Sequence, residues 1–175
     1  MFYIPSRINL DVDAASSAQS ILSHEFLFRT SILNDLFSSA VWVFMVFVFY
    51  RLFKSVNEHI AKLLVALVIV QIPIVFIAES FNITSLLMLK GEILKTFEPG
   101  QRQELAMLLL KINEYGAPAF EVYWGLWLLP LAILVYRSGF LPRFLGVWLA
   151  INGLAFLVLS ITSLLLPEYK DIAFK

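Results

Sequence analysis

The sequence predicts an all-α, polytopic transmembrane helix bundle with four spanning helices, formed by residues 1–175 as a single membrane domain. Of the 175 residues, 60% are hydrophobic and 15% are charged, and the mean hydropathy is +0.83. A soluble domain has about 45–50% apolar and about 25% charged residues. Four apolar stretches have the length of about 20 residues that a helix needs to cross the hydrocarbon layer. They are continuously apolar, whereas membrane β-strands alternate in segments of about ten residues.

The four predicted spans and two further helices follow one another along the chain. The spans cover residues 32–50, 63–87, 117–136 and 144–166. An N-terminal helix is predicted from its cap at Asp13 to Arg29, and another over residues 99–112, polar at its start and apolar later. Both are predicted to be interfacial helices in the headgroup plane or, alternatively, packing elements that cap the bundle.

The distribution of cations predicts the orientation. The loop over residues 51–62 has three Lys or Arg and one acidic residue, and the loop over 137–143 has two cations and no anion. The linker over 90–114 balances four basic against four acidic residues. Short loops rich in Lys and Arg stay in the cytoplasm. We therefore expect both chain ends and the 90–114 linker on the extracytoplasmic side.

Composition excludes several classes of chemistry. The net charge is zero, so no basic face indicates binding to nucleic acid. Cysteine is absent, which excludes disulfides, thiolate metal sites and iron–sulfur clusters. Only two histidines occur, which excludes sites that need three imidazoles from one chain. Neither histidine lies in a predicted span, which disfavours haem. No cofactor is predicted, and a bound lipid or cation is the expected kind of ligand.

Three carboxylates in the predicted spans are the main candidates for function. An acidic side chain near the centre of a membrane helix costs about 2.5–3.5 kcal/mol, so it needs a partner or a purpose. At a rise of about 1.5 Å per residue, Asp35, Glu79 and Glu121 reach a similar depth in the outer half of the bilayer. With polar neighbours on the same helix faces, the candidate buried polar site comprises Asp35, Glu79, Glu121, Asn34, Gln71 and Asn82.

This group has a functional and a structural interpretation. Neighbouring carboxylates can share a cation or relay a proton, and His24 is a candidate nitrogen ligand above them. Alternatively, each carboxylate is protonated or hydrogen-bonded and only fixes packing, or Glu79 and Glu121 reach interfacial water. The identity of a metal, if one binds, does not follow from the sequence.

Small residues on the fourth span predict a helix interface. Residues of this kind on one face let two helix backbones approach closely in lipid. The predicted packing face consists of Gly146, Ala150, Gly153 and Ser160.

Several stretches give the chain a family resemblance. These are Asp13-Ala14-Ala15, Glu25 to Arg29, Asn34-Asp35-Leu36 and, most specifically, Tyr136-Arg137-Ser138-Gly139-Phe140-Leu141-Pro142-Arg143-Phe144-Leu145-Gly146. With these, the sequence resembles the bacterial membrane family designated domain of unknown function 4386. The resemblance implies a bacterial cytoplasmic (inner) membrane protein and one further N-terminal helix ahead of Met1. It implies no activity.

Three classes of function remain open. A small binding, sensor or complex-subunit protein without catalysis ranks first, with membrane lipid and a homo-oligomer or a membrane complex as expected partners. A proton- or cation-coupled transporter or channel using the carboxylates ranks second. A metal-dependent membrane hydrolase ranks third, because the sequence has no His-Glu-x-x-His or Gly-x-Ser-x-Gly motif. An enzyme is therefore the less favoured interpretation.

Overall fold

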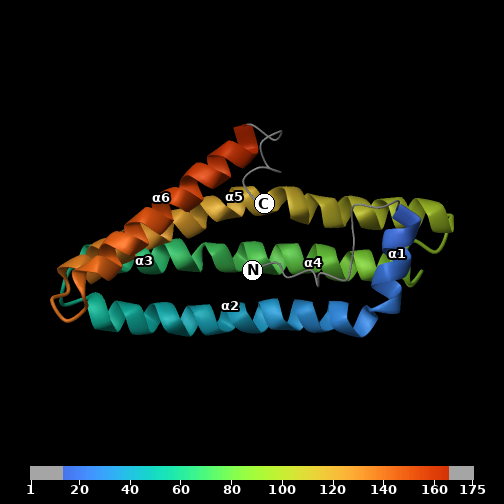
Figure 1. Cartoon of the computed structure of the whole chain (residues 1–175). Coiled ribbons are helices and arrows are strands. Elements are labelled where there is room, and N and C mark those ends of the chain that lie inside the picture. Colours follow the sequence, from blue (N-terminus) through green and yellow to red (C-terminus); the bar gives the residue numbers. More distant parts are fainter. Residues whose placement is uncertain (1–13, 166–175) are drawn as a thin grey trace. The chain divides into compact units, whose positions relative to one another are not determined.

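A computed structural model describes residues 14–165, apart from the side chains of Ala14, Ala117 and Pro118. Within this range the secondary structure is helical and contains no strand (Figure 1). The helices are α1 (Ala14–Ser23), α2 (Glu25–Phe53), α3 (Glu58–Ile69), α4 (Gln71–Leu89), α5 (Pro99–Arg137) and α6 (Arg143–Leu165).

Four helical stretches are long and apolar enough to cross a membrane, which confirms the predicted fold class. They are Glu25–Phe53, Glu58–Leu89, Pro99–Arg137 and Arg143–Leu165. The second stretch joins α3 and α4, so the described residues form five helices if these two are counted together. The predicted cap at Asp13 and the predicted last residue of the fourth span, Leu166, lie outside the described residues.

The N-terminal helix is shorter than predicted. It ends at Ser23, and residues 25–29 already belong to α2. The Ser23 hydroxyl donates to the Ser20 carbonyl at 2.9 Å, and the His24 amide bonds to the carbonyls of both Ser20 and Ile21 at 3.2 Å. The bond to Ile21 spans three residues instead of the four of a regular α-helix, a tightening that is common at helix ends. These bonds close α1 at the point where α2 begins.

The predicted separation between a helix over 99–112 and a span over 117–136 is wrong, because α5 is one continuous helix of 39 residues. It is about 58 Å long, roughly twice the thickness of the hydrocarbon layer. Pro99 stands at its first position, where a proline is well tolerated. Gly116 costs the helix about 1 kcal/mol relative to alanine, which is too little by itself to end it.

The second span is interrupted at Val70. Pro73 has no amide hydrogen to give to the carbonyl of Ile69, and its ring crowds that carbonyl. As a result α3 ends at Ile69 and α4 starts at Gln71. The start of α3 is capped by Asn57, whose Oδ1 accepts a bond of 3.0 Å from the Ile60 amide.

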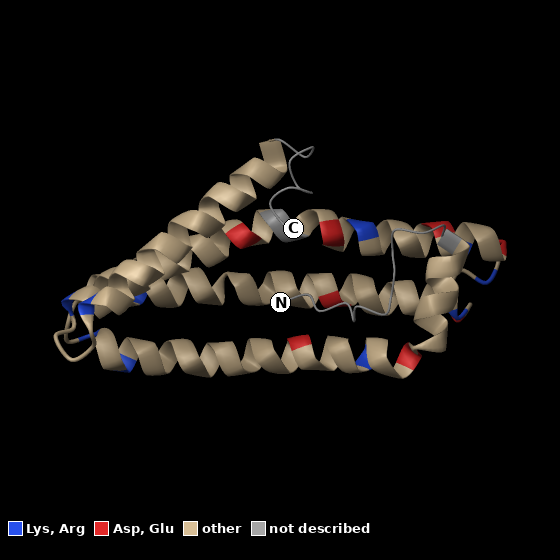
Figure 2. Ribbon diagram, viewed as in Figure 1, with Lys and Arg blue, Asp and Glu red and all other residues tan. Residues whose placement is uncertain are grey.

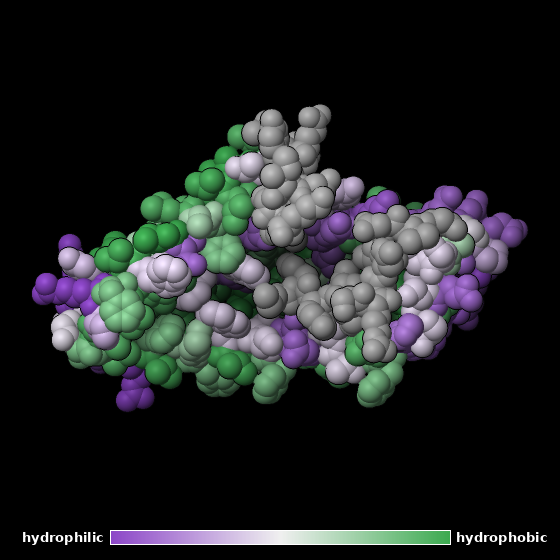
Figure 3. Space-filling view, viewed as in Figure 1, coloured by the Kyte–Doolittle hydropathy of each residue, from purple (hydrophilic) through white to green (hydrophobic). Residues whose placement is uncertain are grey.

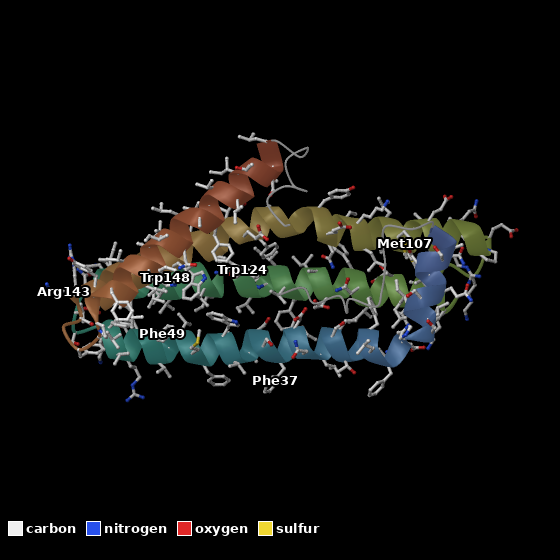
Figure 4. The ribbon with its side chains drawn as sticks, viewed as in Figure 1. Phe37, Phe49, Met107, Trp124, Arg143 and Trp148 are labelled. Carbon is white, nitrogen blue, oxygen red and sulfur yellow. The ribbon has the colours of Figure 1, made fainter. Side chains whose placement is uncertain are left out.

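The chain divides into two compact units. The first unit comprises residues 1–39 and 74–115, and the second comprises 40–73 and 116–175. In the first unit, Ile21 of α1 packs with side chains of α2, α4 and α5 around Met107, which Figure 4 labels beside α1. The buried core of this unit is Ile21, Phe28, Ile32, Leu86, Met107 and Leu110.

The second unit has a core of its own. It joins the second half of α2 to α3 and to the second half of α5. Its buried members are Val46, Phe53, Ala61, Leu64, Val68, Leu131, Leu134 and Val135. The outer face of α6 in this unit is strongly apolar (Figure 3), with Phe144 68% and Trp148 64% exposed. Surfaces of this kind are stable in contact with acyl chains.

Glycines bring α5 and α6 close together within the second unit. A Cβ atom at Gly146 would lie 2.9 Å from the carbonyl oxygen of Ala132, and one at Gly125 would lie 2.7 Å from that of Gly153. Gly146, Gly153 and Ser160 are buried, and Ala150 is half-buried. The backbones of the two helices therefore pack against each other where only hydrogen atoms fit.

We expect Gly146→Ala to destabilise the protein by about 1–3 kcal/mol, because the added methyl group meets backbone atoms that cannot move independently. The measurement is unfolding in mixed micelles followed by circular dichroism. Gly116→Ala is the matched control. A Cβ there meets nothing within 4 Å, so this variant should be as stable as the wild type or up to about 1 kcal/mol more stable. Equal losses in the two variants would contradict this packing.

Candidate buried polar site

Two acidic side chains of the first unit lie buried at the same level. Asp35 on α2 is 5% exposed and Glu79 on α4 is 2% exposed, and the two interact electrostatically. Asp35 lies ten residues after Glu25, and Glu79 lies ten residues before Leu89, so each is about 15 Å from its helix end. Those ends are joined, because Lys90 Nζ lies 3.1 Å from Glu25 Oε1. Because the two ends lie side by side, the two carboxylates are at one depth.

Two asparagines connect Glu79 to α5. The Nδ2 group of Asn82 donates to Glu79 Oε2 at 3.0 Å, and Asn82 Oδ1 accepts from Asn113 Nδ2 at 2.8 Å. Asn113 Nδ2 also donates to the Ala78 carbonyl at 2.9 Å. Residues three apart share a helix face, which is why Asn82 reaches Glu79 within α4. Asn113 then holds this face against α5.

A second contact between α4 and α5 supports this network. The hydroxyl of Ser85, which is fully buried, donates to the Ala106 carbonyl on α5 at 3.1 Å and lies 2.8 Å from the Phe81 carbonyl. Ser85 lies six residues after Glu79, and Ala106 lies seven residues before Asn113. The two helices are antiparallel, so the two contacts occur at successive levels and hold Asn113 in place.

One oxygen of Glu79 has no hydrogen-bond partner in the part of the chain that the structure describes. This atom, Oε1, is buried, while Oε2 accepts a hydrogen bond from the neutral amide of Asn82. An ionised carboxylate in this state costs several kcal/mol, because the buried charge has no cationic partner among the described residues. The arrangement is therefore suited to accept a proton, a small cation or a hydrogen-bond donor at Oε1.

The structure brings together Asp35, Glu79 and Asn82 from the predicted site. Asn34 lies on the exposed face of α2. Gln71 and Glu121 belong to the second unit. Gln71 Nε2 donates to the Leu67 carbonyl at 2.8 Å, beside the interruption of the second span.

The remaining candidates have local surroundings of their own. Glu121 is half-buried in α5 and has an interaction partner. His24 lies in the turn between α1 and α2, where its Nδ1 is 3.0 Å from the Ser20 carbonyl and 2.9 Å from the Ser23 hydroxyl. The described residues contain no group of three or more His, Asp or Glu side chains that could hold a metal ion.

Asn113 was not predicted as a site residue. The sequence pattern assigned it to the linker between two helices, where an asparagine is ordinary. In the continuous α5 it follows the run Leu108-Leu109-Leu110 and precedes an apolar helix half. An asparagine in that position has poor helix propensity, and this was the signal that could have identified it.

The helix ends near this site form a charged network. Glu25 Oε1 accepts from Arg29 Nε at 2.8 Å and from Lys90 Nζ at 3.1 Å, and Lys90 also pairs with Glu92 at 3.0 Å. Hydrogen bonds to Glu92 and then to Glu25 raise the pKa of the Lys90 amine. Because this lysine titrates above neutrality, the links remain ionised at physiological pH.

Comparison with known proteins gives a family and no described activity. The model of the family described as "Domain of unknown function (DUF4386)" matches residues 1–174. Searches of curated proteins and of solved structures give no match. With four helices long and apolar enough to span a membrane, the chain is a multi-pass membrane protein that belongs to the DUF4386 family.

Proposed function

We propose that this protein is a small membrane binding, sensor or complex-subunit protein, and that Glu79 is its ligand-binding group. The observation that carries the proposal is the buried Oε1 atom of Glu79, which has no hydrogen-bond partner among the described residues. The neighbouring Asp35 increases the negative potential at this oxygen. A positive or proton-bearing ligand is therefore the chemical class that fits.

The surroundings of Glu79 favour a proton or a small monovalent cation over a transition metal. Asn82 and Asn113 already use their amide groups for one another and for Glu79. The described residues supply no third His, Asp or Glu ligand, which gives the alternative of a metal-dependent hydrolase no support. Binding without catalysis is the simpler function for such a site.

The proposal includes an orientation and a location. Two short loops of the second unit, residues 51–62 and 137–143, are rich in cations, and such loops stay in the cytoplasm by the positive-inside rule. The proposed orientation of the spanning helices then has Asp35 and Glu79 in the extracytoplasmic half of the bilayer. The resemblance to a bacterial family supports the cytoplasmic membrane as the location, with lipid and either a second copy or a complex subunit as partners.

A proton- or cation-coupled transporter is the second candidate. Asp35 and Glu79 lie at one depth on neighbouring helices, as two groups that pass a proton between them would. A Glu79→Gln protein in liposomes should then show at least tenfold lower proton or cation flux than the wild type. Unchanged flux would remove the transporter and leave the binding function.

We expect wild-type protein in neutral detergent to respond to its ligand, and Glu79→Gln to lose that response. The melting temperature should rise in NaCl or KCl relative to choline chloride at equal concentration. A cation at 100 times its Kd stabilises by about 2.7 kcal/mol. If the ligand is a proton, the infrared spectrum should instead contain a carboxylic-acid band that Glu79→Gln lacks.

Glu104→Gln is the matched control, because Glu104 is exposed on α5. This variant should keep the response of the wild type. The proposal would be refuted by a wild-type protein that shows neither a specific cation effect nor a carboxylic-acid band assigned to Glu79. It would equally be refuted if Glu104→Gln abolished the same response.

We expect Asn113→Leu to destabilise the protein by about 0.6–2 kcal/mol. The substitution removes the two hydrogen bonds that join α5 to Ala78 and Asn82, and hydrogen bonds between membrane helices have about this value. The free energy of unfolding in mixed micelles is the quantity to measure.

Asn152→Leu provides the comparison for that variant. Asn152 Nδ2 donates at 2.8 Å to the Trp148 carbonyl of its own helix, at an exposed position. Its replacement should change the stability by less than about 0.5 kcal/mol. If Asn152→Leu were as damaging as Asn113→Leu, the contact between helices would not be the cause.

A further inference from the structure

Two loops of the second unit come together at one end of it. Residues 54–57 connect α2 to α3, and residues 138–142 connect α5 to α6. The ring of Phe53, at the end of α2, stacks on that of Phe140 with centroids 5.8 Å apart and an angle of 21°. Val56 and Leu141, one from each loop, pack against the same buried core. Charges on the two loops and on the adjoining helix ends therefore share one surface.

This surface carries cations that its own anions leave uncompensated. Figure 2 shows Lys and Arg gathered where α2 meets α3 and where α5 meets α6. The acidic residue of these segments, Glu58, pairs with Lys62 at 2.8 Å. The other cations form no ion pair with the residues that the structure describes. We call these four residues the basic rim: Arg51, Lys54, Arg137 and Arg143.

The charged end of the first unit is different. There, Arg29 and Lys90 both pair with Glu25, and Lys90 also pairs with Glu92. Cations that are satisfied in this way have less attraction left for an external anion. Lys95, Arg102 and Lys111 of that unit have no ion pair with the described residues either. Residues 90–114 nevertheless balance four basic against four acidic residues, whereas residues 51–62 and 137–143 contain five cations and one acidic residue.

Exposed apolar side chains adjoin the basic rim. Phe140 is 53% exposed and Phe144 is 68% exposed. Arg143, labelled in Figure 4 at the start of α6, lies with its guanidinium carbon 5.9 Å from the ring centre of Tyr136. Amphipathic aromatic rings next to cations are typical of the level at which headgroups meet acyl chains.

We propose that the basic rim is a docking surface for anionic phospholipid headgroups. The cations directly follow or precede apolar helices, so they lie within reach of the phosphate layer rather than out in solution. The arginine guanidinium groups can bind a phosphate through two parallel hydrogen bonds. The exposed rings contact the acyl chains of the same lipid, which a soluble anion does not have. Phosphatidylglycerol has the required charge and tail.

The test compares lipid association in reconstituted bilayers. Spin-labelled phosphatidylglycerol and phosphatidylcholine report how strongly each lipid is held at the protein surface. The wild type should prefer phosphatidylglycerol, and 1 M salt should largely abolish this preference. Arg137→Gln/Arg143→Gln should reduce the preference by at least about fivefold, which is the factor that a single nearby cation contributes. Arg137→Lys/Arg143→Lys keeps the charge and should retain most of the preference.

Lys95→Gln/Lys111→Gln is the matched control, since it removes two exposed lysines of the first unit. Its lipid preference should equal that of the wild type. Equal association of the two lipids with the wild type would overturn the proposal, as would an equal loss of preference in the control. If the glutamine variant of the basic rim does not fold, the salt titration of the wild type decides. A preference that 1 M salt leaves unchanged then refutes it.

Discussion

Backbone hydrogen bonding in a medium without water is the constraint on which this structure depends. An unpaired amide or carbonyl in hydrocarbon costs several kcal/mol, so a spanning stretch must satisfy its backbone internally as a helix. This explains why the described part of the chain is helical from residue 14 to residue 165 outside its short connections. It also explains why α5 continues through Gly116, because ending the helix there would expose more unpaired groups than a glycine costs.

Polar side chains in these helices follow the same constraint in two ways. Thr30, Ser39 and Ser80 each donate to the carbonyl four residues earlier, so they need no other helix. Asn113 instead donates across to a neighbouring helix, and the Ser85 hydroxyl is within hydrogen-bond distance both of the Phe81 carbonyl of its own helix and of the Ala106 carbonyl of α5. A hydrogen bond within one helix satisfies the polar side chain without fixing which helix lies next to it. A hydrogen bond between two helices specifies which helices are neighbours, and bonds of this kind between α4 and α5 surround Glu79.

Charge is arranged differently in the two units. In the first, Glu25 and Lys90 link the ends of α2 and α4, and Asp35 and Glu79 lie at one level counted from those ends. In the second, the basic rim has few anions of its own. The paired charges of the first unit lie at the helix ends near a buried polar site. The uncompensated cations of the basic rim can instead attract anions from the surrounding medium. The two units thus use similar residues, a few Lys and Arg near helix ends, for different physical purposes.

The sequence by itself determined the fold class, the four apolar helices and the presence of costly carboxylates, because hydrophobic length and burial energy are properties of local sequence. It did not determine that α5 is a single helix or that Ser23 and His24 end α1, since both depend on small differences between competing backbone bonds. Only the tertiary structure decided that Asn113 joins Asn82 and Glu79 while Asn34 faces outward. Helical periodicity defines faces, but the rotation of each helix follows from contacts between residues far apart in the chain.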